Sequence, residues 1–306
     1  MILEYAFFEG KIRPFGEAKI SIATNAFQYG TGIFEGIRGY YEEKENLVFL
    51  VKPKEHFKRM LGSCKILKIE IPYSIEKLVE LTRELVLKNR PQGNFYIRPI
   101  AYKSHQGIGP NLLGSSDFAI YLLPLGDYYD TKKGMNLTVS SWQRVSDNAI
   151  PPRGKICGAY VNSALAATEA KESGFDDAVI LKEDGRVSEV SGGNIFILRS
   201  GKLITPPVFS GILEGITRGI VIELAQKELG IEVLEREIER SELYIADEIM
   251  VCGTGFQILG VVSIDKRTIG GGDIGPITKK LQDLYFEVVK GKLAKYKEWL
   301  EEIKLG

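Results

Sequence analysis

Lys155 is the residue whose surroundings in this sequence best suit covalent chemistry. It lies in residues 151–162 (PPRGKICGAYVN), among glycines, an alanine and apolar residues. Small neighbours allow a bulky ligand to approach the amine. Apolar neighbours desolvate it, which lowers the pKa of a lysine and makes it a nucleophile able to form a Schiff base. A solvated loop lysine is the ordinary interpretation of a lone Lys, so the assignment depends on the residues that accompany it.

Two glycine-rich segments are suited to binding a phosphate. Residues 213–220 (LEGITRGI) place Thr217 at the start of an expected helix, where unpaired backbone N–H groups and the helix dipole attract an anion. Residues 251–256 (VCGTGF) place Thr254 in a turn after a strand, and such a turn can form a nest of N–H donors. An ordinary helix cap and an ordinary tight turn fit the same residues.

Glu189 adds an acid in residues 187–196 (VSEVSGGNIF), at the end of an expected hairpin strand and before a Ser-Gly-Gly bend. A carboxylate is the partner that a pyridinium nitrogen needs if a pyridoxal ring is to stay protonated and act as an electron sink. A solvated acid at a hairpin end fits equally well. A dinucleotide-binding fingerprint at residues 253–260 is excluded, because a β-branched strand follows the glycines where a helix is required.

Composition excludes several classes of protein. The 40 Lys and Arg balance the 40 Asp and Glu, without the basic excess typical of nucleic-acid binding. Because no apolar run approaches the roughly 18 residues that span a bilayer and no export signal is present, we expect no membrane contact and a cytoplasmic location. Three widely spaced cysteines and two histidines, His56 and His105, support neither a disulfide framework nor a metal site. We predict no metal, and neither histidine is assigned a catalytic role.

These residues need strands and helices to position them. We expect strands at residues 3–8, 34–41, 47–51, 94–102, 118–123, 135–141, 248–252 and 258–264, hairpins at 178–188 and 194–205, and helices at 53–68, 75–88, 162–173, 215–229 and 276–300. This pattern predicts an α+β protein. A small N-terminal domain would span residues 1–124, an interdomain loop residues 125–133, and a large C-terminal domain, which binds the ligand, residues 134–306.

The segments together resemble the fold-type IV pyridoxal-phosphate enzymes, whose fold is D-amino-acid aminotransferase-like, and within them the branched-chain amino-acid aminotransferases. The matches cover almost the whole chain and include residues 29–38 (YGTGIFEGIR), 96–99 (YIRP), 155–163, 188–196, 213–218, 243–248 (LYIADE), 252–254 and 275–279 (GPITK). The resemblance implies two α/β domains joined by the interdomain loop. It also implies a homodimer or higher homo-oligomer, with loop 104–110 near the active site of the neighbouring subunit.

The resemblance further implies a role for each matching residue. Lys155 would be the catalytic residue, bound covalently to pyridoxal 5′-phosphate, with Glu189 at the ring nitrogen and Tyr160 at the phenolic oxygen. The whole cofactor-binding set would be Arg59, Lys155, Tyr160, Glu189, Leu213, Ile216, Thr217 and Thr254. The substrate-binding set would be Tyr29, Phe34, Gly36, Arg38, Tyr96, Arg98, Thr254 and Gly255. Arg98 would meet the distal carboxylate of glutamate or 2-oxoglutarate.

The implied reaction is transamination of leucine, isoleucine and valine with 2-oxoglutarate, giving branched-chain 2-oxo acids and L-glutamate, as in branched-chain amino-acid biosynthesis. Two departures concern pocket size and substrate preference: Leu125 replaces a tryptophan often found in the interdomain loop, and Gly255 stands where an alanine is common. The alternatives on the same fold are a D-amino-acid or (R)-amine transaminase, or an aminodeoxychorismate lyase. A non-catalytic metabolite-binding protein is a further alternative, and its signature would be loss of the lysine, whereas Lys155 is present.

Overall fold

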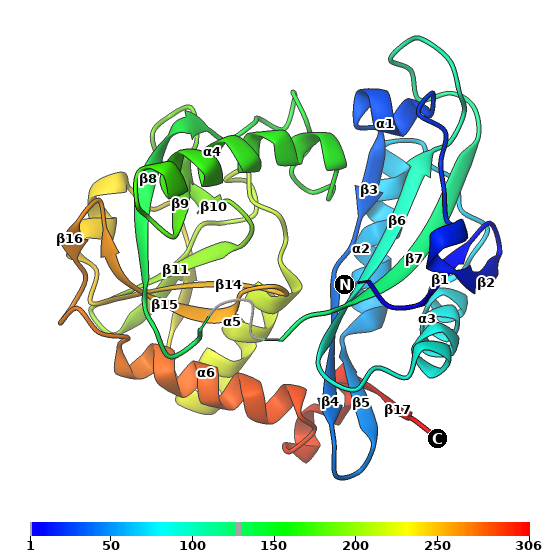
Figure 1. Ribbon diagram of the computed structural model, residues 1–306. Helices are drawn as coiled ribbons and strands as arrows, with labels where there is room; N and C mark the ends of the chain where they lie inside the picture. Colours follow the sequence, from blue (N-terminus) through cyan, green and yellow to red (C-terminus); the bar gives the residue numbers. More distant parts are fainter. Residues whose placement is uncertain (1, 127–129) are drawn as a thin grey trace. The chain divides into compact units, whose positions relative to one another are not determined.

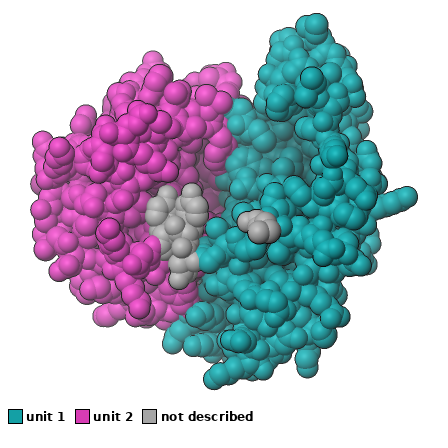
Figure 2. Space-filling view, viewed as in Figure 1, with its two compact units in different colours: residues 1–126, 154–158, 287–306 teal, residues 127–153, 159–286 magenta. Residues whose placement is uncertain are grey.

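The computed structural model describes residues 2–126 and 130–306, and the chain forms two compact units. Unit 1 contains Met1–Gly126, Gly154–Gly158 and Glu287–Gly306, and unit 2 contains Asp127–Arg153 and Ala159–Phe286; Figure 2 shows them in separate colours. The units differ from the sequence-based domains because two later segments, 154–158 and 287–306, belong with the N-terminal residues. Residues 127–129 of the predicted interdomain loop lie outside the described residues.

Unit 1 is built on an eight-stranded sheet in which every strand pair is antiparallel (Figure 1). The strand order is β17-β5-β4-β6-β7-β1-β2, and β3 pairs with β6 off this path. Its elements are β1 (Tyr5–Phe8), β2 (Lys11–Pro14), η1 (Phe15–Glu17), α1 (Asn25–Tyr29), β3 (Gly32–Phe34), β4 (Ile37–Glu42), β5 (Leu47–Val51), α2 (Pro53–Ile66), α3 (Ile75–Asn89), β6 (Phe95–Lys103), β7 (Ser116–Pro124), η4 (Ala294–Trp299) and β17 (Leu300–Lys304).

Strand β6 shows how sequence alternation gives this sheet two faces. Phe95, Ile97 and Pro99 are buried, whereas Tyr96 and Arg98, on the opposite face, are half-buried. Successive side chains of a strand point to opposite faces, so the two residues predicted for a substrate pocket lie side by side. Helices α2 and α3 pack against each other, α2 also near β3 and α3 near β1.

Unit 2 is built on a nine-stranded mixed sheet of order β10-β9-β8-β15-β14-β11-β12-β13, with β16 paired to β15. Its elements are β8 (Met135–Gln143), α4 (Tyr160–Glu172), β9 (Asp177–Leu181), β10 (Val187–Val190), β11 (Asn194–Arg199), β12 (Lys202–Thr205), α5 (Ile216–Leu229), β13 (Val233–Glu235), η3 (Arg240–Ile245), β14 (Glu248–Gly253), β15 (Gln257–Ile264), β16 (Arg267–Thr268) and α6 (Pro276–Val289); η2 (Cys157–Ala159) lies where the chain enters the unit. Both hairpins predicted between residues 178 and 205 are confirmed as antiparallel pairs, β9–β10 and β11–β12.

Two helices of unit 2 connect parallel strands. Helix α4 links β8 to β9 and packs on both, and α5 links β12 to β13. Gly230 ends α5 in the left-handed conformation at a φ of 63°, as predicted for a C-terminal glycine. The sheet buries a continuous apolar cluster that includes Val179, Ile195, Ile197, Val251 and Leu259, so the strands that carry the predicted site residues stand on a packed core.

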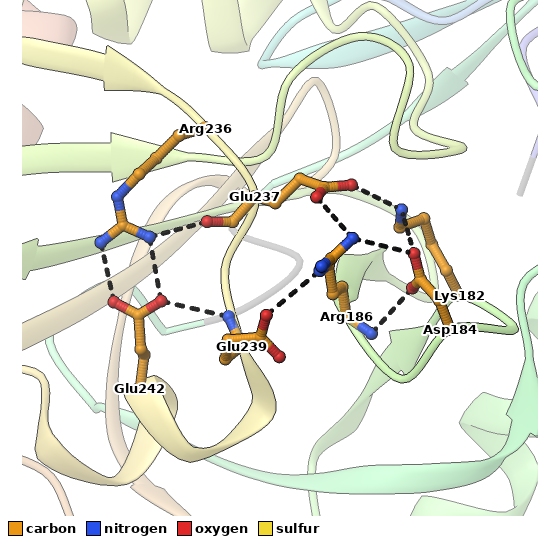
Figure 3. Close-up of polar contacts among 7 residues, drawn as sticks. All are labelled: Lys182, Asp184, Arg186, Arg236, Glu237, Glu239 and Glu242. Atoms are coloured by element: carbon orange, nitrogen blue, oxygen red, sulfur yellow. Dashed lines mark hydrogen bonds and ion pairs between the residues drawn. The ribbon is translucent and has the colours of Figure 1, made fainter.

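An ion network fastens the β9–β10 turn to the chain that follows β13 (Figure 3). Lys182 contacts Asp184 and Glu237, both at 2.8 Å, and Arg186 contacts Glu237 at 2.7 Å and Glu239 at 3.1 Å. A linked group of this kind is more than an isolated surface pair, whose contribution is typically below about 1 kcal/mol. The network stabilises the hairpin that carries Glu189 on its second strand.

The helix predicted from residue 276 to about residue 300 was too long. Helix α6 ends at Val289, Gly291 takes a φ of 70°, and the chain then forms η4 and β17, which pairs with β5. The amide of Lys292 donates to the carbonyl of Glu287, the hydrogen bond of a glycine-terminated helix end. Within the described residues, no helix has both the length and the apolar character that crossing a bilayer requires.

Candidate active site

The lysine segment, residues 154–158, lies along strand β3 in unit 1. The amide of Phe34 donates to the carbonyl of Lys155 at 3.1 Å, Ile156 forms a bridge with Ile33, and the amide of Gly158 donates to the carbonyl of Gly30 at 3.2 Å. A Cβ on Gly30 would lie 2.9 Å from the Cα of Gly158. Gly30 therefore permits the close approach of two backbones that fixes the lysine beside β3.

Helix α2 presents three polar side chains to the same region. His56, Arg59 and Ser63 follow one another at helical spacing and so share one face of the helix. The hydroxyl of Ser63 donates to the carbonyl of Arg59 at 3.0 Å and accepts from the amide of Lys155 at 3.2 Å. Ser63 thereby ties the lysine backbone to the helix that carries Arg59.

The side chains of Lys155 and Arg98 both lie against the ring of Phe34. The lysine Nζ is 4.8 Å from the ring centroid, and the guanidinium carbon of Arg98 is 4.4 Å from it. Arg98 is also 5.1 Å from the ring centroid of Tyr96. Four of the residues predicted from the resemblance thus lie together, as an aromatic wall with two cationic groups.

The pKa of Lys155 falls from its usual 10.5 to about 8. Burial is the main cause, because desolvation disfavours the charged ammonium relative to the neutral amine. Arg59 and Arg98 lower the pKa further, and Tyr96 and Glu35 oppose them. The amine is therefore a far better nucleophile near neutral pH than an ordinary lysine.

Gly36 is required by the ring of Tyr96. A Cβ at position 36 would lie 1.6 Å from the tyrosine hydroxyl oxygen and 2.3 Å from the ring carbon that bears it. No rotation of a side chain at position 36 relieves a clash made by its own Cβ, so any residue larger than glycine must displace Tyr96. Gly36 therefore leaves free the space that the ring of Tyr96 occupies.

Two other residues of the predicted substrate set have different neighbours in unit 1. Tyr29, at the end of α1, accepts a hydrogen bond from the amide of Gly109 at 2.9 Å, which ties it to loop 104–110. Arg38 is 1% exposed, donates to the carbonyl of Gly126 at 2.5 Å, and lies 5.5 Å from the ring centroid of Tyr40. These contacts indicate an anchoring role for Arg38 at the end of unit 1's first segment.

Glu189 is one of the predicted site residues that lie in unit 2. One carboxylate oxygen lies 2.6 Å from Nη2 of the largely buried Arg144, and the other accepts from the side chain of Asn194 and the amide of Leu213, both at 3.1 Å. Arg144 also donates to the carbonyl of Gly211 at 2.9 Å. Three donors from separate segments therefore fix the orientation of this carboxylate.

The start of α5 adjoins the same group. Asn194 donates to the carbonyl of Leu213 at 3.0 Å, and a Cβ on Gly215 would lie 2.0 Å from the Asn194 side-chain oxygen. Gly215 therefore allows the helix to begin against Asn194. Ile216 and Thr217 occupy the first turn, and no side chain at the N-cap position bonds its amides. Such a helix start is suited to an anion.

Thr254 and Gly255 lie in the turn between β14 and β15, beside the Glu189 group. Asn194 pairs with Cys252 across β11 and β14, and a Cβ on Gly193 would lie 2.6 Å from the Cys252 carbonyl oxygen. A Cβ on Gly255 would meet nothing within 4 Å, so the described surroundings accept the alanine often found there. Tyr160 is the first residue of α4 in unit 2, five positions after Lys155.

The family of this chain follows from comparison with known proteins. A family model described as amino-transferase class IV matches residues 32–264, which contain all the predicted site residues except Tyr29. The chain belongs to the class IV aminotransferases. The resemblance inferred from the short segments is confirmed, as is the mixed arrangement of helices and strands.

Relatives of this class IV aminotransferase extend over its full length. A probable branched-chain-amino-acid aminotransferase of Aquifex aeolicus (strain VF5) is 53% identical over 302 residues, covering 98% of this chain and 97% of the relative. The crystal structure of a branched-chain aminotransferase from Thermoproteus uzoniensis with norvaline has a TM-score of 0.93 at 40% identity and 99% coverage of both chains. The branched-chain amino acid aminotransferase of Thermobaculum terrenum in its PLP form has a TM-score of 0.94 at 35% identity and 98% coverage of both chains.

Glu35, Arg144 and Asn194 were not among the residues predicted to act at the site, yet each holds one that was. Glu35 binds Arg59 through both carboxylate oxygens, and Arg144 and Asn194 bind Glu189. Glu35 and Asn194 lie inside segments that carried the resemblance, which was the available signal. Arg144 had none, because an arginine after a strand is ordinarily a solvated charge.

Proposed function

We propose that this enzyme is a pyridoxal-phosphate-dependent aminotransferase that transfers the amino group of leucine, isoleucine or valine to 2-oxoglutarate. The observation that carries the proposal is the amine of Lys155, with its pKa lowered to about 8, against the ring of Phe34 next to Arg98. It joins a nucleophile, an apolar wall and a cation in one group. The names and structures of the relatives support the same reaction.

The cofactor would be held by residues whose chemistry fits it. Lys155 would bind its aldehyde, Glu189 its ring nitrogen and Tyr160 its phenolic oxygen; Leu213 would pack on the ring. The phosphate would meet Arg59, Ile216, Thr217 and Thr254. The uncapped start of α5 and the oriented carboxylate of Glu189 are the observations that support this assignment. When bound, pyridoxal phosphate supplies an electron sink for the bonds at the substrate's Cα.

Residues of this chain divide the remaining work. The amine of Lys155 would accept the proton from the substrate's Cα and deliver it to the C4′ carbon of the cofactor, a task suited to a base whose pKa lies near the working pH. Arg144 and Asn194 keep Glu189 in one orientation, so that its carboxylate meets the ring nitrogen without first reorganising. Phe34 and Tyr96 exclude water from the reacting atoms.

Dual substrate recognition follows from the same wall. An aliphatic side chain would pack on Phe34 and Tyr96, and the distal carboxylate of glutamate would bind Arg98, which already lies within 5.1 Å of both ring centroids. The backbone at Thr254 and Gly255 would hold the α-carboxylate. An arginine packed on aromatic rings serves both classes of substrate, since its planar group stacks and also donates paired hydrogen bonds.

We also propose that the enzyme is a homodimer or a higher homo-oligomer. Unit 1 exposes large apolar residues at its α1 end and on the chain beyond β6, with Ile22 84%, Phe27 69%, Ile108 97% and Leu113 70% exposed. Loop 104–110 is fixed to α1, because Asn25 donates to the carbonyl of Gly109 at 3.1 Å. A fixed loop that presents an exposed isoleucine is suited to contact with a second copy.

Half-reactions test the proposed activity. The cofactor-loaded protein is mixed with L-leucine, D-alanine or (R)-1-phenylethylamine, and conversion to the pyridoxamine form is followed by absorbance. We expect L-leucine to convert it and the other two amines to be poor donors. Conversion by D-alanine or the aromatic amine but not L-leucine would instead assign the enzyme to the D-amino-acid or (R)-amine transaminases.

Borohydride reduction and peptide mapping test the lysine. We expect the pyridoxyl adduct on Lys155 and none in Lys155→Met. Lys103→Met is a matched control, because Lys103 is a buried lysine of unit 1 and donates to the backbone carbonyls of Lys68 and Gly114. An adduct that survives in Lys155→Met, or one lost in Lys103→Met alone, contradicts the assignment.

A further inference from the structure

Glu35 is the centre of a buried charge cluster in unit 1 that the proposed reaction leaves unexplained. Its side chain is 0% exposed. One carboxylate oxygen accepts from Nε of Arg59 at 2.7 Å; the other accepts from Nη2 of Arg59 and lies near Nδ1 of His56, both at 2.8 Å. The amide of Gly36 donates to the second oxygen at 3.2 Å. A charged side chain is almost never buried this completely unless it is paired, as Glu35 is with Arg59.

Stability alone is a weak reason for this arrangement. Removing two charges from water costs about as much as their attraction returns, and apolar residues of the same volume often serve a fold as well. The geometry indicates orientation instead. A guanidinium is planar, so two nitrogens gripped by one carboxylate fix the directions of all its N–H groups.

The protonation states of Glu35 and His56 depend on burial and on the other members of the cluster. Burial by itself raises the pKa of Glu35, but the Arg59 charge and hydrogen bonds from His56 and Arg59 outweigh burial and hold it well below its usual range. Burial also lowers the pKa of His56, against the attraction of Glu35, so the ring is neutral at pH 7. A neutral ring that donates to the carboxylate carries its proton on Nδ1. One anion and one cation leave the cluster with no net charge.

We propose that Glu35 is a positioning residue for Arg59 in recognition of the cofactor phosphate, and that His56 holds Glu35 in turn. The inference rests on the proposed function, in which Arg59 binds that phosphate. His56 and Arg59 are three residues apart on α2, and Glu35 joins β3 to β4, so the carboxylate links the helix to the sheet. Arg59 is thereby held ready, and the entropy of its long side chain is lost on folding instead of on binding.

The affinities of the cofactor-free protein for pyridoxal phosphate and for pyridoxal test the proposal. Their ratio measures what the phosphate contributes, and side reactions of pyridoxal in solution cancel between variants. We expect Glu35→Gln to lower the ratio at least about tenfold, since a neutral amide cannot replace the paired, charge-assisted hydrogen bonds that the carboxylate accepts from Arg59. Arg59→Met should lower it by more, and adding Glu35→Gln to Arg59→Met should change it no further. The 31P resonance of bound cofactor should shift in Glu35→Gln.

Glu248→Gln is the matched control, because Glu248 is also buried and accepts from two backbone amides, those of Ile277 and Thr278. It should leave the ratio unchanged whatever it does to thermal stability. His56→Leu, which removes the donor behind Glu35, should lower the ratio by less than Glu35→Gln does. His56→Asn, which restores an N–H donor, should recover part of the loss, and these two variants decide the matter if Glu35→Gln does not fold.

The outcomes separate this inference from the function on which it rests. Equal weakening of both ligands by Glu35→Gln, or a further fall of the ratio in the double variant, would overturn the positioning role and leave the aminotransferase intact. An unchanged ratio in Arg59→Met would overturn the positioning role together with the phosphate assignment of Arg59. If the borohydride test alone failed, with no pyridoxyl adduct on Lys155, that result would instead refute the proposed function.

Discussion

The lowered pKa of Lys155 makes a quantitative prediction about the cofactor-free enzyme. With a pKa of about 8 in place of 10.5, the neutral fraction of the amine at pH 7 rises about 300-fold, from roughly 0.03% to roughly 9%. Only the neutral amine attacks an aldehyde. The rate of reaction with pyridoxal phosphate should therefore rise with pH and level off above about 8.

Stopped-flow absorbance from pH 6.5 to 10.5 measures this profile. Rates are divided by those of a free lysine derivative, after the latter are corrected for that amine's own neutral fraction at each pH, so that ionisations of the reagent cancel. Arg98→Met should move the inflection upward and Glu35→Gln downward, because the first removes a cation near the amine and the second an anion. A rate that still climbs beyond pH 10, or shifts of the same sign in both variants, would refute the electrostatic reasoning.

The same shift carries a cost in stability. Between pH 8 and 10.5 the unfolded lysine holds a proton that the folded one has lost, so stability increases with pH across that window, and below it the full penalty applies. At 1.36 kcal/mol per pKa unit this penalty is at most about 3 kcal/mol, and it is smaller than that because the side chain of Lys155 is only half-buried. Lys155→Met should therefore stabilise the cofactor-free protein at pH 7 in urea unfolding. Equal or lower stability would contradict the burial argument.

Two further predictions concern single positions. Hydrogen bonds from Arg236 outweigh burial and hold the pKa of Glu242 at about 2, below its usual 4.5. Glu242→Gln should thus lower the free energy of unfolding by roughly 1 to 3 kcal/mol above pH 5. In urea unfolding, this difference from wild type should vanish as pH falls toward 2, and a difference that stays constant with pH would exclude the ionic cause. Gly36→Ala should displace Tyr96, destabilise by about 1 to 3 kcal/mol and lower kcat/KM for leucine. Gly62→Ala, in the interior of α2 with a Cβ that meets nothing within 4 Å, should instead stabilise by up to about 1 kcal/mol; equal effects of the two substitutions would argue against the clash.

Local chemistry explains which elements were predictable. The alternation of apolar residues and the turn at residues 183–186 predicted β9 and β10, and Gly230 correctly marked the end of α5. The error at the C-terminus has the opposite cause. Strand β17 exists because it pairs with β5, about 250 residues earlier in the chain, and no local pattern reports a partner so distant. The available signal was Gly291, a helix-ending glycine passed over within an otherwise amphipathic run.

The residue types of the candidate site could be predicted from the sequence, but the contacts between those residues could not. Lys155 and Phe34 were both identified from the sequence, but backbone contacts such as the bridge between Ile33 and Ile156 bring their segments together, and no local pattern reports such contacts. Arg59, on a helix with many lysines, would have passed as a solvated charge without the family resemblance. Its partner Glu35 was not found, because an ion pair between residues 24 apart depends on how helix α2 lies on the sheet.

Charge balance over the chain conceals a local excess that serves two purposes. Around Lys155 lie Arg59 and Arg98, with Glu35 as the opposing anion, so the group keeps one positive charge even when the lysine is neutral. That charge lowers the pKa of the amine and also attracts the carboxylates of the proposed substrates. The two effects share a cause and cannot be tuned apart. Arg98→Met should therefore weaken glutamate binding while making Lys155 a poorer nucleophile at neutral pH, and a variant that did only one would show that separate groups supply the two effects.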